Sequence, residues 1–294
     1  MNRKNGALPI IVAGILWGII SIFIRNISGG GLSSLQICFV RMLVASVSFA
    51  IFVLIKDRNA FRIRLKDIWM FIGTGIISVT LFNAFYFYTM INAEASLAVV
   101  LLYTSPVFIM LLSRIIFKEK ITAFRLLALV LTLVGCVLVT GLLQGGINVT
   151  STVIITGLCA GLFYALYTIF SRFALKRYSS LTITVYTFIF GLFGSLFIGK
   201  PVDTLQILAK NPSLIFWCIG VGIICTVLPY VFYTMGLARI DSSKASILVA
   251  VEPLVGSLIG MLLYKESHSP LKLLGIAFIL ASIIILGRSD GKNE

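Results

Sequence analysis

The amino-acid sequence predicts an all-α membrane protein with ten transmembrane helices, arranged as two inverted five-helix repeats. Three observations predict this fold: the apolar composition, the number of apolar runs that could cross a bilayer, and an internal repeat. Of the 294 residues, 59 % are hydrophobic and only 12 % are charged, and the mean hydropathy is +1.08. Soluble globular proteins have about a quarter of their residues charged, so this composition excludes a soluble enzyme.

Ten apolar runs follow one another along the chain, with short linkers between them. A bilayer core needs about 20 apolar residues per helix. The runs are continuous rather than alternating, which indicates helices and excludes the strands of a membrane barrel. We expect the ten helices at residues 8–28, 34–55, 68–91, 95–116, 121–142, 151–171, 181–199, 212–237, 243–264 and 270–287.

The basic residues predict how these helices are oriented. If both termini are cytoplasmic, 18 of the 24 Lys and Arg residues lie on the cytoplasmic side, five lie outside and Arg41 lies within a helix. Positive charge gathers in the cytoplasmic loops of membrane proteins. We therefore expect a multi-pass protein of the cell (cytoplasmic) membrane with both termini in the cytoplasm. This bias also accounts for the net charge of +14 without any binding to nucleic acid.

An internal repeat relates the two halves of the chain. Residues 96–140 align without a gap with residues 243–287, and ten of the 45 pairs are identical, including Pro106 with Pro253. Because each unit holds five helices, the second copy enters the membrane upside down, which is the architecture of many secondary transporters. The two predicted repeats cover residues 1–142 and 143–294.

Glu252 is the acidic residue that lies deepest in a predicted helix. It is nine residues past Ser243, which places it ~14 Å into the helix at about 1.5 Å per residue. A charge near mid-bilayer costs at least ~2.5–3.5 kcal/mol, so the carboxyl must face water, pair or be protonated. We expect it to bind a proton or a cationic group of a substrate. The alternative is a structural partner for Arg41 or for the backbone beside Pro253.

Arg41 lies ~10 Å below the outer end of its helix, at about 1.5 Å per residue. Its guanidinium could bind a carboxylate or phosphate with two parallel hydrogen bonds. The alternatives are snorkelling to the lipid headgroups and an ion pair with Glu252.

Neutral polar and aromatic residues recur within the same apolar runs. Aromatic walls with a few hydroxyl or amide groups are typical of small-ligand sites. We expect Arg41 and Glu252 to share a substrate-binding cavity with Trp17, Ser21, Ser78, Asn83, Tyr86, Tyr103, Tyr164, Tyr167 and Tyr230.

Prolines and glycines within the runs predict local features of the helices. Each proline removes a backbone donor, so we expect breaks that leave three carbonyls without their usual partners, those of Leu102, Val249 and Cys225. Pairs of glycines four residues apart let helices approach closely, and we read them as packing sites. They are Gly14 with Gly18, Gly157 with Gly161, and Gly256 with Gly260.

A set of short motifs occurs in register along nearly the whole chain. They are Leu16-Trp17-Gly18, Arg41 to Ala45, Ser105-Pro106, Phe117-Lys118-Glu119, Ala165 to Thr168, Ser171-Arg172, Val251-Glu252-Pro253 and Tyr264-Lys265-Glu266. In these motifs the chain resembles the EamA-type members of the drug/metabolite transporter superfamily. This resemblance implies ten helices with both ends cytoplasmic, transport of small metabolites through a central cavity, and peripheral positions for the fifth and tenth helices. Ala160 departs from the family pattern, because a tryptophan is common there.

The sequence therefore predicts a secondary transporter that works as a monomer in the lipid bilayer. It would move a small metabolite, amino acid-like or a related amphipathic solute, by alternating access. The alternatives are a channel or lipid scramblase-like facilitator without coupled transport, and a non-transporting subunit. The sequence contains one histidine, no Cys-x-x-Cys, no nucleotide-binding loop and no zinc-protease motif, so we expect no enzyme activity, no cofactor and no metal site.

Overall fold

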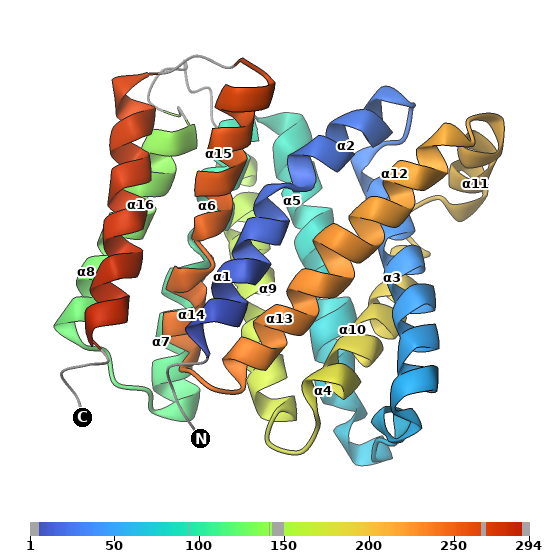
Figure 1. Ribbon diagram of the computed structural model, residues 1–294, viewed down its shortest axis with the longest axis horizontal. Helices are drawn as coiled ribbons and strands as arrows, with labels where there is room; N and C mark the ends of the chain where they lie inside the picture. The colour runs from blue at the N-terminus through green and yellow to red at the C-terminus, as the bar shows by residue number, and fades with distance from the viewer. Residues whose placement is uncertain (1–5, 94, 141, 143–149, 266–268, 290–294) are drawn as a thin grey trace.

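The described part of the chain is helical and contains no strand. The computed structural model describes residues 6–93, 95–140, 142, 150–265 and 269–289. The first helix begins at Ala7 and the last ends at Ser289, and both points lie at the same end of the helix bundle (Figure 1). We call this the terminal end, and we call the opposite end the distal end.

In the first part of the chain, several membrane-length helices are each divided into two or more consecutive helical segments. The elements in chain order are α1 (Ala7–Gly18), α2 (Ile20–Gly29), α3 (Ser34–Lys56), the short helices η2 (Arg58–Phe61) and η3 (Leu65–Asp67), α4 (Ile68–Ile72), the π-helix η4 (Gly73–Thr80), α5 (Leu81–Asn92), α6 (Ala95–Leu102), α7 (Ser105–Phe117) and α8 (Ala123–Thr140).

The second part of the chain follows a similar order. Its elements are α9 (Ser151–Ala174), α10 (Ser180–Ser195), α11 (Pro201–Lys210), α12 (Ser213–Gly222), the π-helix η6 (Ile223–Val227), α13 (Leu228–Leu237), α14 (Ser242–Leu248), α15 (Val251–Leu263) and α16 (Pro270–Ser289). Helices α8 and α16 lie side by side at one edge of the bundle (Figure 1), where the family resemblance placed the fifth and tenth helices.

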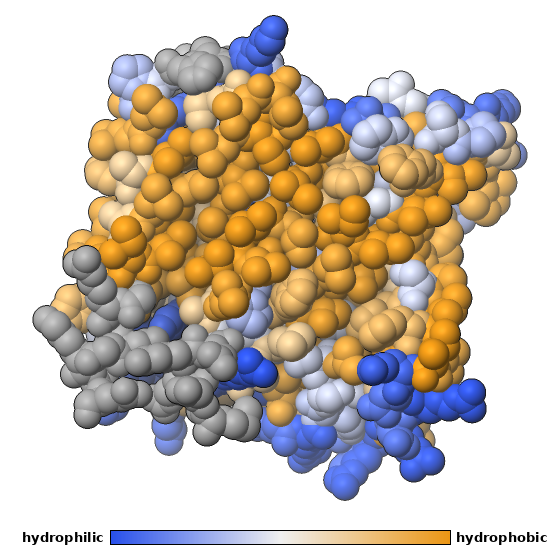
Figure 2. All heavy atoms as spheres, in the orientation of Figure 1, coloured by the Kyte–Doolittle hydropathy of each residue, from blue (hydrophilic) through white to orange (hydrophobic). Residues whose placement is uncertain are grey.

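Each of the ten predicted apolar runs contains helix among its described residues. Among the described residues, eight helical stretches are long and apolar enough to cross a membrane. The two remaining apolar helices are shorter, at Ser180–Ser195 and Pro270–Leu286. Figure 2 shows an apolar band across one face of the molecule, with polar residues gathered toward the two ends. The chain is a multi-pass membrane protein.

Two of the long helices break at a proline motif. One breaks between α6 and α7, just before Ser105-Pro106, and the other between α14 and α15, just before Glu252-Pro253. As predicted, the Val249 carbonyl lacks its usual helical partner, because Pro253 has no N–H. What the prediction missed is a substitute, since the backbone N–H of Glu252 donates to this carbonyl at 3.0 Å. The chain tightens into a three-residue turn there, which keeps the carbonyl bonded and offsets the next helix segment.

The glycine pairs bring helix backbones together at these breaks. A Cβ atom on Gly18 would lie 2.8 Å from the carbonyl oxygen of Glu252, and one on Gly161 would lie 3.0 Å from that of Leu101. Real Cβ atoms do not approach a carbonyl this closely without a shift of the backbone. Helix α1 therefore rests on the break before α15, and α9 rests on the break after α6. A Cβ atom on Gly256 would make only ordinary contact with the Gly18 carbonyl oxygen, at 3.7 Å.

Helix α11 was not expected from the sequence, which assigned residues 200–211 to a linker. Pro201 lies in its first turn, where the fixed φ of proline favours helix. The helix has ten residues and is too short to span a membrane. Val202 and Leu205 on its surface are 68 % and 52 % exposed.

Candidate functional site

A cavity of about 270 Å³ lies within the helix bundle. Its size is near the lower end of small-ligand sites, which begin at about 300 Å³. It brings together eight of the eleven residues that the sequence predicted for a binding site. These are Trp17, Ser21, Arg41, Asn83, Tyr86, Tyr164, Tyr230 and Glu252.

The cavity wall extends toward the distal end of the bundle. Ser34, which lines it, is the first residue of α3, and Met90 lies near the end of α5. Both helix ends are at the distal end (Figure 1). Glu252 and Arg41 are only partly buried, so both charged groups can be reached from the cavity.

Glu252 lies in the first turn of α15, where the helix break turns its side chain into the cavity wall. The Tyr103 hydroxyl, from the corresponding break between α6 and α7, is its hydrogen-bond partner. Tyr103 is therefore behind the carboxyl group and is not part of the wall. Among the described residues no ion pair joins Glu252 to Arg41, so the structural alternative of a direct pair between these two residues is not observed.

Arg41 projects into the cavity from α3. Its Nε donates to Thr226 Oγ1 at 3.1 Å, and Thr226 Oγ1 donates to the Val221 carbonyl at 2.9 Å. Thr226 belongs to the π-helix η6, whose wider turn lets its hydroxyl reach the carbonyl five residues earlier. The guanidinium is thus held by a neighbouring helix rather than extended to the lipid headgroups.

Two further predicted residues, Ser78 and Tyr167, lie beside the main cavity. Ser78 donates to the Phe163 carbonyl at 2.9 Å, and the Tyr167 hydroxyl is 2.9 Å from Thr234 Oγ1. Both line a small void of about 10 Å³ next to the cavity. They hold helices together in this conformation and do not form the wall of the main cavity.

The sequence missed the apolar part of the cavity wall. Isoleucine, phenylalanine, leucine and methionine are frequent throughout this chain, so no compositional signal separates the lining residues from those that face lipid. The missed apolar residues are Ile20, Ile24, Ile37, Phe82, Phe87, Met90 and Leu102, and the polar Ser34 at the start of α3 was missed as well.

An aromatic layer lies on the terminal side of the cavity. The Tyr230 ring stands edge-on to Tyr167, with ring centres 5.0 Å apart, and edge-on to Trp17, at 5.4 Å. One helical turn nearer the terminal end, the Tyr233 hydroxyl is 2.7 Å from Thr168 Oγ1. These contacts join α9 to α13 across the bundle, and the void found among these residues measures only about 10 Å³.

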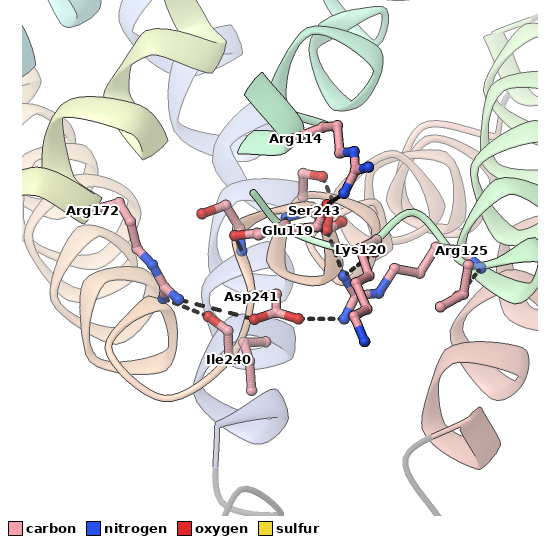
Figure 3. A network of polar contacts seen from close by, with 11 residues as sticks. Arg114, Glu119, Lys120, Arg125, Arg172, Ile240, Asp241 and Ser243 are labelled. Carbon is pink, nitrogen blue, oxygen red and sulfur yellow. Dashed lines mark hydrogen bonds and ion pairs between the residues drawn. The ribbon is translucent and has the colours of Figure 1, made fainter. Parts of the chain in front are cut away.

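A network of charged residues joins the loops at the terminal end (Figure 3). The Glu119 carboxylate accepts hydrogen bonds from the backbone N–H groups of Ser242 and Ser243, at 2.9 and 3.2 Å. It thereby caps the N-terminus of α14, where a negative charge is favourable. Arg125 forms an ion pair and a hydrogen bond with Asp241. The network ties the connection between α7 and α8 to the connection between α13 and α14.

Arg172 adds a third helix to this network. Its Nη1 donates to the carbonyls of Leu237 and Ile240 at 2.6 and 2.8 Å, and its Nη2 is 4.0 Å from Asp241. Of the two Lys-Glu motifs found in the sequence, Lys118-Glu119 therefore has a structural role, while Glu266 lies outside the described residues. No three His, Cys, Asp or Glu side chains gather closely enough to hold a metal ion in the part of the chain that the structure describes.

Comparisons with known proteins agree with this arrangement. The model of the EamA-like transporter family matches residues 4–141 and again residues 151–288. A protein of Archaeoglobus fulgidus named as an uncharacterized transporter is 28 % identical over 289 residues, which cover 97 % of each chain. The uncharacterized inner membrane transporter YicL of Salmonella typhimurium is 24 % identical over 97 % of this chain and 96 % of its own. One solved crystal structure has the same fold, with a TM-score of 0.81 at 16 % identity, over 98 % of this chain and 99 % of that chain.

Proposed function

Because this chain belongs to the EamA-like transporter family, we propose that it is a secondary transporter that works by alternating access. Its cargo is a small amino acid-like or related amphipathic solute, carried across the cytoplasmic membrane. The observation that supports this most directly is a cavity that extends toward one end of the bundle and is closed off from the other by aromatic and charged layers. A carrier caught in one of its two access states has this shape.

The chemistry of the cavity supports a zwitterionic substrate. Arg41 on α3 offers a cation for a carboxylate, and Glu252 on α15 offers an anion for an ammonium group. The faces of Trp17, Tyr86 and Tyr230 add surfaces that attract an ammonium group through their π electrons. Since the two charges do not pair with each other, each is available to one end of the same small molecule.

The proposed architecture is ten transmembrane helices in two inverted repeats, at residues 1–142 and 143–294. The family match to two separate stretches supports it. So do the two helix breaks before Pro106 and Pro253 and the left-handed backbone of Lys118 and Lys265, with φ of 57° and 52°. Each of these features recurs at the spacing of the sequence repeat.

We further propose that the terminal end faces the cytoplasm, because that orientation places 18 of the 24 basic residues on the cytoplasmic side. In this orientation the cavity extends toward the outside. The aromatic layer and the charged network then close the cytoplasmic side.

The test is transport by the purified protein in liposomes, after a thermal-shift screen against the twenty standard L-amino acids. A bound ligand raises the unfolding temperature of the state that binds it. We expect at least one amino acid to stabilise the protein. Its flux should then saturate with concentration and be accelerated by the same amino acid on the opposite side. Flux that rises linearly without such acceleration would establish the alternative, a channel-like facilitator. Stabilisation by none of the twenty would exclude the standard amino acids as cargo and overturn the proposal in that form.

A further inference from the structure

Thr226 stands between the helix backbone and the charged wall of the cavity. Its side chain is completely buried, at 0 % exposure, and it does not line the cavity. Its hydroxyl accepts a hydrogen bond from Arg41 Nε at 3.1 Å and donates one to the Val221 carbonyl at 2.9 Å. Both functions of a hydroxyl group are therefore used, and the direction of its hydrogen is determined by the helix.

We propose that Thr226 is a positioning residue, which orients the Arg41 guanidinium for a substrate carboxylate. The contact with Nε fixes one edge of the planar group. Within the described residues, no hydrogen bond occupies the two Nη atoms, which carry the remaining N–H donors. A carboxylate can then bind to both Nη atoms with two parallel hydrogen bonds. This proposal rests on the proposed function, and it assigns the carboxylate end of the substrate to Arg41.

The first repeat contains a related threonine that touches no arginine. Thr80, in the π-helix η4, donates to the Gly75 carbonyl five residues earlier at 3.1 Å, just as Thr226 does in η6. Thr80 packs instead against Gly194, whose Cβ, if it had one, would lie 2.3 Å from the Thr80 hydroxyl. Each threonine therefore makes the same kind of hydrogen bond within its own π-turn. Of these two threonines, Thr226 is the one that contacts a cation.

This difference provides a matched pair of variants. Thr226→Val and Thr80→Val each remove a hydroxyl from a π-turn with little change of shape. Only the first removes the acceptor of Arg41 Nε–H. Thr226→Ser keeps that acceptor and should restore the wild-type behaviour.

The first measurement follows the Arg41 Nε–H directly, without any substrate. Protein labelled with ¹⁵Nε-arginine gives one signal per arginine side chain, and the Arg41 signal is identified by its loss in Arg41→Lys. We expect hydrogen exchange at this Nε–H to be at least about tenfold faster in Thr226→Val than in the wild type, in line with the loss of a hydrogen bond to a charged group. Thr226→Ser and Thr80→Val should exchange as the wild type does. Equal exchange in all four proteins would overturn the proposed contact.

The second measurement compares each standard L-amino acid that binds with its methyl ester, which lacks the carboxylate. In Thr226→Val we expect the affinity for the amino acid to fall about tenfold and the affinity for the ester to stay unchanged. An equal loss for both ligands, or no loss for either, would overturn the positioning role. If the wild type binds no amino acid, the proposed cargo fails, while the Nε–H exchange still decides whether Thr226 holds Arg41.

Discussion

Glu252 occupies a position where a carboxyl group can act on a solute and can also exchange a proton with water. It lies in the wall of the cavity, is partly exposed there, and keeps one hydrogen bond, to the Tyr103 hydroxyl behind it. A buried structural carboxylate would be surrounded by donors on all sides. The incomplete set of partners favours a role in transport over a structural one.

We therefore expect Glu252→Gln to insert and fold but to transport poorly. The amide keeps the shape of the carboxyl and its contact with Tyr103, but it removes the negative charge and the exchangeable proton. Flux into liposomes should fall about tenfold or more, and the remaining flux should no longer vary with pH. Asp203→Asn, which changes an exposed carboxylate on α11, is the control and should transport as the wild type does. If the flux through Glu252→Gln still depends on pH, this residue has no role in the mechanism.

At the level of single residues, the sequence could identify the charged, tryptophan and tyrosine members of the cavity, because these residue types are rarer in the apolar runs than phenylalanine, leucine or isoleucine. It could not tell which polar side chains face the cavity and which bond to a neighbouring helix, as Ser78 does to Phe163. Nor could it pair Arg41 with Thr226, because these residues are 185 positions apart. Their contact depends on how α3 packs against η6, and no local pattern records that packing.

At the level of helices, the closest packing occurs where a glycine meets a break. Gly18 on α1 lies against the carbonyl of Glu252, which is in the first turn of α15. The position of the cavity wall at Glu252 therefore depends on the fact that residue 18, on the neighbouring helix α1, is a glycine without a side chain. This packing gives the glycine a role beyond helix association.

We expect Gly18→Ala to destabilise the protein by about 1–3 kcal/mol, the usual cost of overpacking. The added methyl group would lie 2.8 Å from a backbone carbonyl and 2.6 Å from Val255 Cβ, so the helices must separate. Thermal unfolding in detergent measures the loss. Gly29→Ala, at the end of α2, is the control because no atom lies within 4 Å of its added Cβ. Equal unfolding temperatures for the two variants would contradict the assigned packing.

The existence and order of the helices could be predicted from the apolar runs, and the prolines correctly indicated where two of them break. The hydrogen bond from the Glu252 N–H to the Val249 carbonyl could not be predicted, because it depends on how tightly the chain turns between these two residues. Helix α11 escaped notice because its apolar residues are too few to form a run. The local sequence thus predicted where the helices lie. The geometry at their ends could be determined only from the structure.

At the level of the whole molecule, the two ends of the bundle differ. The cavity wall extends toward the distal end, and two successive layers close the terminal end. Asp241 is central to the outer layer, because it contacts both Arg125 and Arg172. In the proposed alternating-access mechanism, these ion pairs would separate when the terminal end opens.

We therefore expect Asp241→Asn to favour the state that is open at the terminal end. A cysteine placed at Ser21, in the cavity wall, reports on access when a charged maleimide is added from either side of the membrane, in a background without native cysteines. Labelling from the side of the terminal end should become several-fold faster in Asp241→Asn. Asp57→Asn, an exposed carboxylate just after α3, should leave the labelling unchanged. Slow labelling from that side in both variants would show that the network is not a gate.

The close contact of α1 with α15, and of α9 with α6, has a consequence for how the polypeptide is made. The two stretches matched by the family model each leave a helix backbone bare until the other stretch arrives. If the gene were divided between them, either fragment produced alone should be degraded. Both fragments produced in the same cell should assemble into a working carrier. In the intact protein, we therefore expect the amino-terminal stretch to reach its stable tertiary structure only after the carboxy-terminal stretch has been translated.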